Sequence, residues 1–150
     1  MLFVRRTKEK ILVCLPTYHS PESWILRAVE SLMDQTYSNF ECWIVKDGCK
    51  KACNFNPNFS ERTCLECEKC KETEILCKKI VEKDARFKFF CMPINFGAAG
   101  WGPRNFIIMN TDHNYIAYLD DDNWYEPDHL ESLYKSITES NSDMAYTGTK

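Results

Sequence analysis

The sequence predicts an α/β fold in which an open, mostly parallel sheet carries helices on both of its faces. Short apolar runs of strand length alternate along the chain with segments whose apolar residues recur at helical spacing. The chain has 150 residues, of which 44% are hydrophobic and 27% charged, and this is typical of one globular domain. Polar residues follow several of the apolar runs, as expected where strand ends border a ligand site.

The first part of the chain is expected to form a strand, a helix and a second strand. Residues 11–15 are an apolar run that ends at Pro16, which predicts a buried strand. Ser20 is expected to cap a helix that has Pro21 at its first position and one long apolar face. Residues 40–45 predict the second strand.

Residues 49–70 interrupt this pattern with lysine, asparagine, proline and five cysteines, and we interpret them as an insertion into a single domain that covers residues 1–150. The elements expected after residue 70 are a helix over 73–83, a strand over 86–91, a glycine-rich loop over 95–102, a helix over 103–110, a strand over 115–119, a helix from 127 and a fifth strand over 143–147.

The overall charge and the apolar runs exclude some partners. With 19 basic and 22 acidic side chains the net charge is −3, which gives no reason to expect nucleic acid or an acidic membrane as a partner. No apolar run is long enough to span a bilayer, and the N-terminus lacks an apolar signal core, so we expect a soluble, cytoplasmic protein. The nine cysteines are an odd number and are expected to be reduced thiols, some of them on a metal.

Three consecutive carboxylates, Asp120, Asp121 and Asp122, follow the strand expected over 115–119. Like charges at this spacing repel one another, so beside an apolar strand they must be exposed, protonated or paired with a cation. A metal ion is the functional interpretation. A solvated turn is the alternative, because Asp and Asn favour turns.

Polar clusters follow four expected strands, and parallel strands would bring all four clusters to one edge of the sheet. These clusters are Pro16, Thr17 and Tyr18 after the first strand, Asp47 after the second, Asn95 and Gly97 after the third, and the three aspartates after the fourth.

Three stretches resemble family 2 glycosyltransferases, which have the Rossmann-like GT-A fold: "ILVCLPTYHSPESWILRAVESLMDQTYSNFECWIVKDG", "INFGAAGWGPRN" and "YIAYLDDDNWYEPDHLESL". The resemblance covers nearly the whole chain apart from the cysteine-rich insertion. It implies a nucleotide-diphosphate-sugar donor, with a uridine diphosphate sugar most expected, and a divalent cation, Mn²⁺ or Mg²⁺. It also implies transfer of the sugar to a hydroxyl of a saccharide or protein acceptor.

The resemblance also implies roles for individual residues. Pro16, Thr17 and Tyr18 match the loop that flanks the nucleotide base, Asp47 matches the carboxylate that accepts a hydrogen bond from the base, and Arg104 matches a residue that faces the nucleotide.

The acidic triplet matches the family's Asp-X-Asp signature. Asp122 is implied to bind the metal, Asp121 to reach the ribose or sugar, and Asp120 to contribute to the metal's shell. The chemistry agrees, because a hard cation prefers carboxylate and phosphate oxygens.

The sequence departs from the family pattern in two ways. Most members have two aspartates where this chain has Lys46 and Asp47. Adjacent strand residues alternate faces, so Lys46 is expected to point away from Asp47 and to meet solvent. The acceptor-binding half and the catalytic base are expected to lie beyond Lys150, so a catalytic residue is not identified in this chain.

The cysteine-rich insertion has spacing close to that of structural zinc sites, although it lacks two separate CxxC pairs. The zinc candidates are Cys53, Cys64, Cys67 and Cys70, with Cys49 and Cys77 as further candidates. Free thiols are the alternative. Among the histidines, only His19 is expected near the ligand.

Three functions remain open from the sequence. The first is the donor-binding part of a metal-dependent glycosyltransferase. The second is a catalytically incomplete module that binds a nucleotide-sugar without transfer, and the third is a zinc-stabilised interaction domain.

Overall fold

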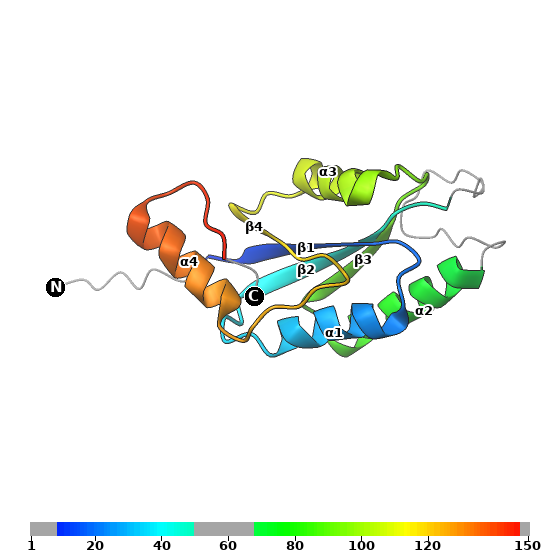
Figure 1. Ribbon diagram of the computed structural model, residues 1–150, viewed down its shortest axis with the longest axis horizontal. Helices are drawn as coiled ribbons and strands as arrows, with labels where there is room; N and C mark the ends of the chain where they lie inside the picture. Colours follow the sequence, from blue (N-terminus) through cyan, green and yellow to red (C-terminus); the bar gives the residue numbers. More distant parts are fainter. Residues whose placement is uncertain (1–8, 50–67, 148–150) are drawn as a thin grey trace.

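The computed structural model describes residues 9–49 and 68–147. Its four strands form one parallel sheet in the order β3-β2-β1-β4 (Figure 1), so the α/β fold predicted from the sequence is confirmed. The elements in chain order are β1 (Ile11–Thr17), α1 (Glu22–Met33), β2 (Phe40–Lys46), α2 (Glu68–Lys83), β3 (Phe87–Cys91), the short 3-10 helix η1 (Ala98–Gly100), α3 (Trp101–Asn110), β4 (Tyr115–Tyr118) and α4 (His129–Ser140).

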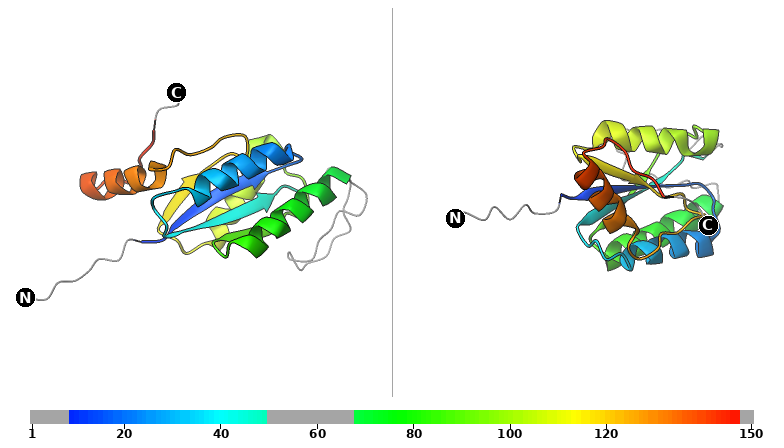
Figure 2. Two further views of the ribbon diagram at one scale, coloured as in Figure 1. Left: turned by 90° about the horizontal axis from the view of Figure 1, so that it is seen from below. Right: turned by 60° about the vertical axis from the view of Figure 1, so that its left-hand side comes forward.

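Helices cover both faces of the sheet: α1 and α2 lie against one face and α3 against the other (Figures 1 and 2). The alternation of side chains along β1 explains both layers. Val13 packs with Ile25 of α1 in one core cluster, whereas its neighbour Leu12 packs with Ile107 of α3 in the other. Within the described part of the chain, no helix is both long enough and apolar enough to cross a bilayer.

The strand order places a crevice at one edge of the sheet. The chain runs outward from β1 through β2 to β3, and then returns to add β4 on the other side of β1. Loops after β1 and β4 therefore leave the sheet from adjacent strands that belong to opposite halves of the fold. In open parallel sheets, this point of reversal is where ligands bind, beyond the carboxyl ends of the strands.

Some predicted details are wrong. No strand forms over residues 143–147, which lie beside no partner strand, and Met144 and Tyr146 in this stretch are 74% and 85% exposed. Ser20 does not cap α1; its hydroxyl donates to the carbonyl of Tyr18, and Pro21 takes the N-cap position without a side-chain hydrogen bond. Helix α2 begins at Glu68, five residues before the predicted start, because apolar spacing is absent from its polar first turn.

Candidate functional site

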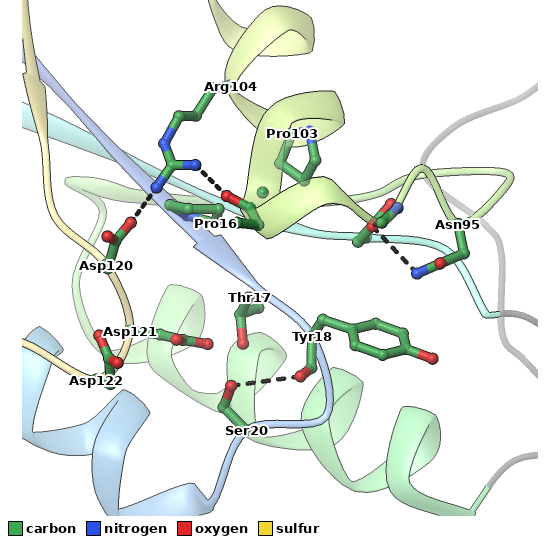
Figure 3. A pocket seen from close by; sticks show the side chains of 14 residues that line it. Pro16, Thr17, Tyr18, Ser20, Asn95, Pro103, Arg104, Asp120, Asp121 and Asp122 are labelled. Atoms are coloured by element: carbon green, nitrogen blue, oxygen red, sulfur yellow. Dashed lines mark hydrogen bonds and ion pairs between the residues drawn. The ribbon is translucent and has the colours of Figure 1, made fainter.

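A cavity of about 380 Å³ lies beyond the carboxyl ends of β1 and β4 (Figure 3). Its walls come from the loop after β1, the end of β2, the glycine-rich loop with the start of α3, and the loop after β4. The lining includes all of the residues that the sequence predicted for the nucleotide-sugar site: Pro16, Thr17, Tyr18, Asp47, Arg104, Asp120, Asp121 and Asp122. The fold thus brings four separate segments to one place.

The end of β1 supplies one wall of the cavity. Thr17 is buried, and its Oγ1 is a buried atom without a hydrogen-bond partner in the described structure. Its carbonyl accepts a hydrogen bond of 2.9 Å from the backbone N–H of Asp47, which fixes the ends of β1 and β2 together. A buried hydroxyl without a partner is costly, so Thr17 is suited to hydrogen bond a polar group that enters the cavity.

Asp47 anchors the glycine-rich loop. Its Oδ1 accepts hydrogen bonds from the backbone N–H groups of Gly48 and Phe96 at 2.9 and 3.0 Å. Its Oδ2 accepts from the side-chain amide of Asn95 and the backbone N–H of Gly97, both at 3.1 Å. Gly97 has a φ of 63°, which glycine adopts without strain. The observed role of Asp47 is therefore to hold this loop, and direct contact with a nucleotide base stays a prediction.

Arg104 lies in the first turns of α3 and crosses the cavity wall to the loop after β4. Its guanidinium donates to the carbonyl of Ala99 and forms an ion pair with the carboxylate of Asp120 (Figure 3). A guanidinium has five N–H donors, so these two contacts leave further donors for an anion in the cavity. Arg104 thus lines the cavity, and its contact with a nucleotide stays a prediction.

The three aspartates after β4 have different surroundings. Asp120 pairs with Arg104, whereas Asp121 has a buried Oδ2 that lacks a hydrogen-bond partner among the described residues. Asp122 is exposed, its Oδ1 accepts from the Asn123 amide at 3.0 Å, and its carbonyl accepts from Arg27 at 2.5 Å. Arg27 of α1 therefore steadies this loop, a role that the sequence analysis missed.

The charge balance of the cavity favours a bound cation. Its lining contains one guanidinium, from Arg104, against four carboxylates, from Asp47, Asp120, Asp121 and Asp122. An anionic ligand such as a diphosphate would be repelled from this surface unless a cation accompanied it. The three consecutive aspartates do not converge on one point as a ready-made three-ligand cluster. They fit an ion such as Mg²⁺, which is bound by one or two carboxylates together with phosphate oxygens.

Comparison with known proteins identifies the family. The profile of glycosyl transferase family 2 matches residues 12–53 and 70–150. The chain belongs to this family. A relative, the glycosyltransferase GlyA of Streptococcus pneumoniae serotype 4, is 30% identical over 137 residues, which are 91% of this chain and 16% of that protein.

Solved structures agree on the GT-A fold. Staphylococcus aureus TarS, in a complex with UDP, superposes with a TM-score of 0.64 at 23% identity over 88% of this chain and 33% of that one. The mannosyltransferase PcManGT from Pyrobaculum calidifontis, in complex with GDP-Man and Mn²⁺, gives a TM-score of 0.55 at 14% identity over 80% and 29% of the two chains.

The family profile leaves out part of the insertion, and the chain covers only a small part of each of its first relatives. The match omits residues 54–69, which lie within the segment that we interpret as an insertion. The chain spans less than a fifth of the length of the first curated relatives that it matches.

Lys46, which replaces the first aspartate of the family pattern, does not meet solvent as predicted. Its side chain is 1% exposed, and its Nζ lies 3.6 Å from Oε1 of Glu74 on α2, whose side chain is 2% exposed. Lys46 enters the side of the sheet that α2 covers, and its Nζ also donates to the backbone carbonyl of Asp47 at 3.4 Å. Burial lowers the pKa of Lys46, yet the nearby Cys91, Cys70 and Glu74 outweigh burial and raise this pKa above its usual value. No sequence pattern points to the partner, Glu74, because it lies on the far side of the insertion.

The zinc prediction is only partly within the described structure. Cys53, Cys64 and Cys67 lie outside the described residues, and Cys70 is buried on α2. The sulfur of Cys70 lies 2.9 Å from Nε2 of His19. Cys49 completes a group of three possible metal ligands with them, whereas Cys77, the other candidate, belongs to the apolar core. His19 was not predicted as a metal ligand, since 51 residues separate it from Cys70.

Proposed function

We propose that this chain is the donor-binding part of a metal-dependent glycosyltransferase that uses a nucleotide-diphosphate sugar. The observation that carries the proposal is the cavity at the strand-order reversal. Its lining has four carboxylates and one guanidinium, and it includes two buried oxygens that lack a partner among the described residues, Thr17 Oγ1 and Asp121 Oδ2. Such a lining suits a ligand that brings both a metal ion and many polar groups. The family of the chain supports the same chemistry.

Each part of the cavity has a proposed share in binding the donor. Pro16, Thr17 and Tyr18 flank the nucleotide base. Arg104 faces the phosphates, because its remaining guanidinium donors suit phosphate oxygens. Asp121 reaches the ribose or the sugar, since its Oδ2 can accept from a hydroxyl. Asp47 shapes the cavity through the glycine-rich loop.

Asp122 is proposed to hold the metal, with Asp120 in the surrounding shell. A bound Mn²⁺ or Mg²⁺ neutralises charge on the diphosphate, which makes it a better leaving group. The ion pair between Arg104 and Asp120 keeps both side chains oriented toward the cavity before any ligand arrives. The acceptor is proposed to be a hydroxyl of a saccharide or a protein.

A uridine diphosphate sugar is the proposed donor. TarS, which shares the fold, has been solved with UDP and with UDP-GlcNAc, and PcManGT has been solved with GDP-Man. Both nucleotides therefore belong in the test. Preferential binding of UDP over GDP is the expected result.

Calorimetry with UDP tests the proposal, with and without Mn²⁺. We expect binding to weaken by at least about tenfold without the metal, and Asp122→Asn to abolish most of the metal dependence. Asp112→Asn is the matched control, since this exposed carboxylate precedes β4 at the opposite edge of the sheet. Equal affinity with and without Mn²⁺, or an Asp122→Asn variant that behaves as the control does, would exclude this assignment.

A further inference from the structure

A second group of potential metal ligands lies next to the donor cavity and has a different chemistry. His19 follows β1, Cys49 follows β2, and Cys70 lies in the first turns of α2. One ligand atom from each lies within 4.8 Å of those from the other two. Cys49 and Cys70 are buried and His19 is half-buried, so the group is enclosed but reachable from one side.

The distances suit a tetrahedral zinc ion. Zinc bonds to sulfur at about 2.3 Å and to nitrogen at about 2.0–2.1 Å, so tetrahedral ligand atoms lie roughly 3.5–3.8 Å apart. The distance of 2.9 Å between His19 Nε2 and Cys70 Sγ is about 0.6 Å shorter than this separation, and the limit of 4.8 Å for the whole group exceeds it by about 1 Å. Small side-chain rotations in both directions would bring the three atoms to the tetrahedral separation. Two thiolates and a neutral imidazole also balance the charge of a divalent zinc, so the buried complex carries no net charge.

Two backbone features hold these ligands in place. His19 has a φ of 48°, a left-handed conformation that is unfavourable for residues with a Cβ and that turns its ring toward α2. Gly48, which precedes Cys49, packs so closely against the backbone of Ile94 that a Cβ at this position would collide with it. The backbone is therefore tightly constrained at His19 and next to Cys49.

The group is also connected to the donor cavity. The ring of Tyr18, which lines the cavity, stacks on the imidazole of His19 with ring centroids 4.0 Å apart and an interplanar angle of 20°. An ion that fixes the imidazole would therefore also fix the aromatic ring beside it. Sulfur and imidazole ligands select zinc over Mn²⁺ or Mg²⁺, so this group is chemically distinct from the aspartates after β4.

We propose that His19, Cys49 and Cys70 bind a zinc ion whose fourth tetrahedral ligand is a water molecule. The ion would join the loop after β1 to the end of β2 and to α2 and thereby order Tyr18. The effect on Tyr18 rests on the proposed donor-binding function, whereas the zinc site itself does not. The ligand set differs from the one that the spacing of the insertion predicts, because two of its members lie outside the spaced cysteines.

Elemental analysis of the untagged chain, without any nucleotide, tests the zinc site. We expect about one equivalent of zinc in the wild type, and His19→Ala and Cys70→Ser to bind zinc at least about tenfold more weakly in competition with a chromophoric chelator. The matched controls are His113→Ala, a half-buried histidine before β4, and Cys77→Ser, a buried cysteine on the same helix, and both should keep zinc. Circular dichroism verifies that each variant is folded.

Cobalt substitution gives a second measurement that does not depend on the stability of a variant. Co²⁺ bound to the wild type should give a thiolate charge-transfer band in the near ultraviolet and the intense visible bands of a tetrahedral ion, and His19→Ala should alter the visible bands. Wild-type zinc affinity in His19→Ala, or an unchanged cobalt spectrum, would overturn the assignment of this ligand set.

The coupling to the donor cavity needs its own experiment. Removal of zinc by a chelator, with Mn²⁺ restored afterwards, should weaken UDP binding several-fold, and readdition of zinc should restore it. Unchanged UDP binding after zinc loss would overturn the role of the ion in ordering Tyr18. Zinc binding in a chain that does not bind UDP under any condition would leave the zinc site intact and refute the proposed function instead.

Discussion

Replacement of Asp47 by asparagine should loosen the glycine-rich loop over the cavity. The carboxylate accepts four hydrogen bonds, and three of them come from the loop, from Asn95, Phe96 and Gly97. An asparagine oxygen at the Oδ1 position keeps the bonds from Gly48 and Phe96. Its amide then faces the donors of Asn95 and Gly97, so those two bonds are lost and donors oppose donors.

The expected magnitude follows from these two lost bonds. Hydrogen bonds to a charged group contribute about 1.5–3 kcal/mol each, which gives roughly 3–6 kcal/mol for two. Water can reach part of this loop once it opens, so we expect the lower end, a loss of about 3 kcal/mol in the free energy of unfolding. Urea denaturation measures this loss, and hydrogen exchange should show faster exchange at the amides of Phe96 and Gly97.

Asp112→Asn is again the control and should change the stability by less than about 0.5 kcal/mol. Unchanged exchange at Phe96 and Gly97 in Asp47→Asn would refute the anchoring role. Ligand binding separates this role from direct reading of the base. A loosened loop should weaken the binding of UDP and of pyrophosphate with Mn²⁺ alike, whereas loss of UDP binding alone would mean that Asp47 contacts the base.

Three further substitutions test a buried ion pair, a surface ion pair and a close backbone contact. Lys46→Met should lower the free energy of unfolding, measured by urea denaturation, by about 3–5 kcal/mol because it leaves Glu74 charged and buried. Adding Glu74→Leu should recover most of this loss. A Lys46→Met variant within about 1 kcal/mol of wild type would contradict the prediction. The pKa of the Asp84 carboxyl is lowered because the Arg86 side chain donates hydrogen bonds to the carboxylate. This interaction stabilises the folded state by about 1 kcal/mol above the unfolded pKa near 3.8, and the stabilisation is lost as the pH falls through the lower folded pKa. Asp84→Asn should therefore be less stable than wild type at about pH 6 and equal to it at about pH 2, and an equal difference at both would refute the linkage. Gly48→Ala should destabilise the chain by at least about 2 kcal/mol, because the added methyl group collides with the backbone of Ile94, and a neutral effect in thermal melting would contradict the packing.

The sequence predicts the sheet well because strand and helix periods differ so clearly in it. The apolar runs that begin at Ile11, Phe40 and Tyr115 all form parallel strands, and the residues at their carboxyl ends line one cavity. Local patterns are enough for this result, since parallel strands place all their carboxyl ends at one edge. The stretch over 143–147 also predicts a strand, yet a strand requires a neighbour to pair with, and local patterns do not contain that information.

Contacts between distant segments are what the sequence could not predict. Lys46 is buried because α2 covers it and supplies Glu74 as its partner, and local patterns around Lys46 do not contain this contact. The approach of His19 to Cys70 depends on the same helix and on a left-handed backbone at His19. The contact of Lys46 with Glu74 spans the cysteine-rich insertion, and that of His19 reaches Cys70 at its last position, so no spacing rule connects either pair.

The four residues at the end of β2 explain why the two candidate metal sites are so close yet chemically separate. Alternation along the chain sends Lys46 toward Glu74 on α2 and Asp47 toward the glycine-rich loop. Gly48 permits the tight passage beside the next segment, and Cys49 then returns to the α2 side, where His19 and Cys70 lie. The proposed zinc ligands therefore lie on the α2 side of this segment, whereas Asp47 lies on the side of the glycine-rich loop and the donor cavity. Since soft cations prefer sulfur ligands and hard cations prefer oxygen ligands, the proposed zinc ion would select the group with Cys49 and Cys70, and the proposed Mn²⁺ or Mg²⁺ would select the aspartates after β4.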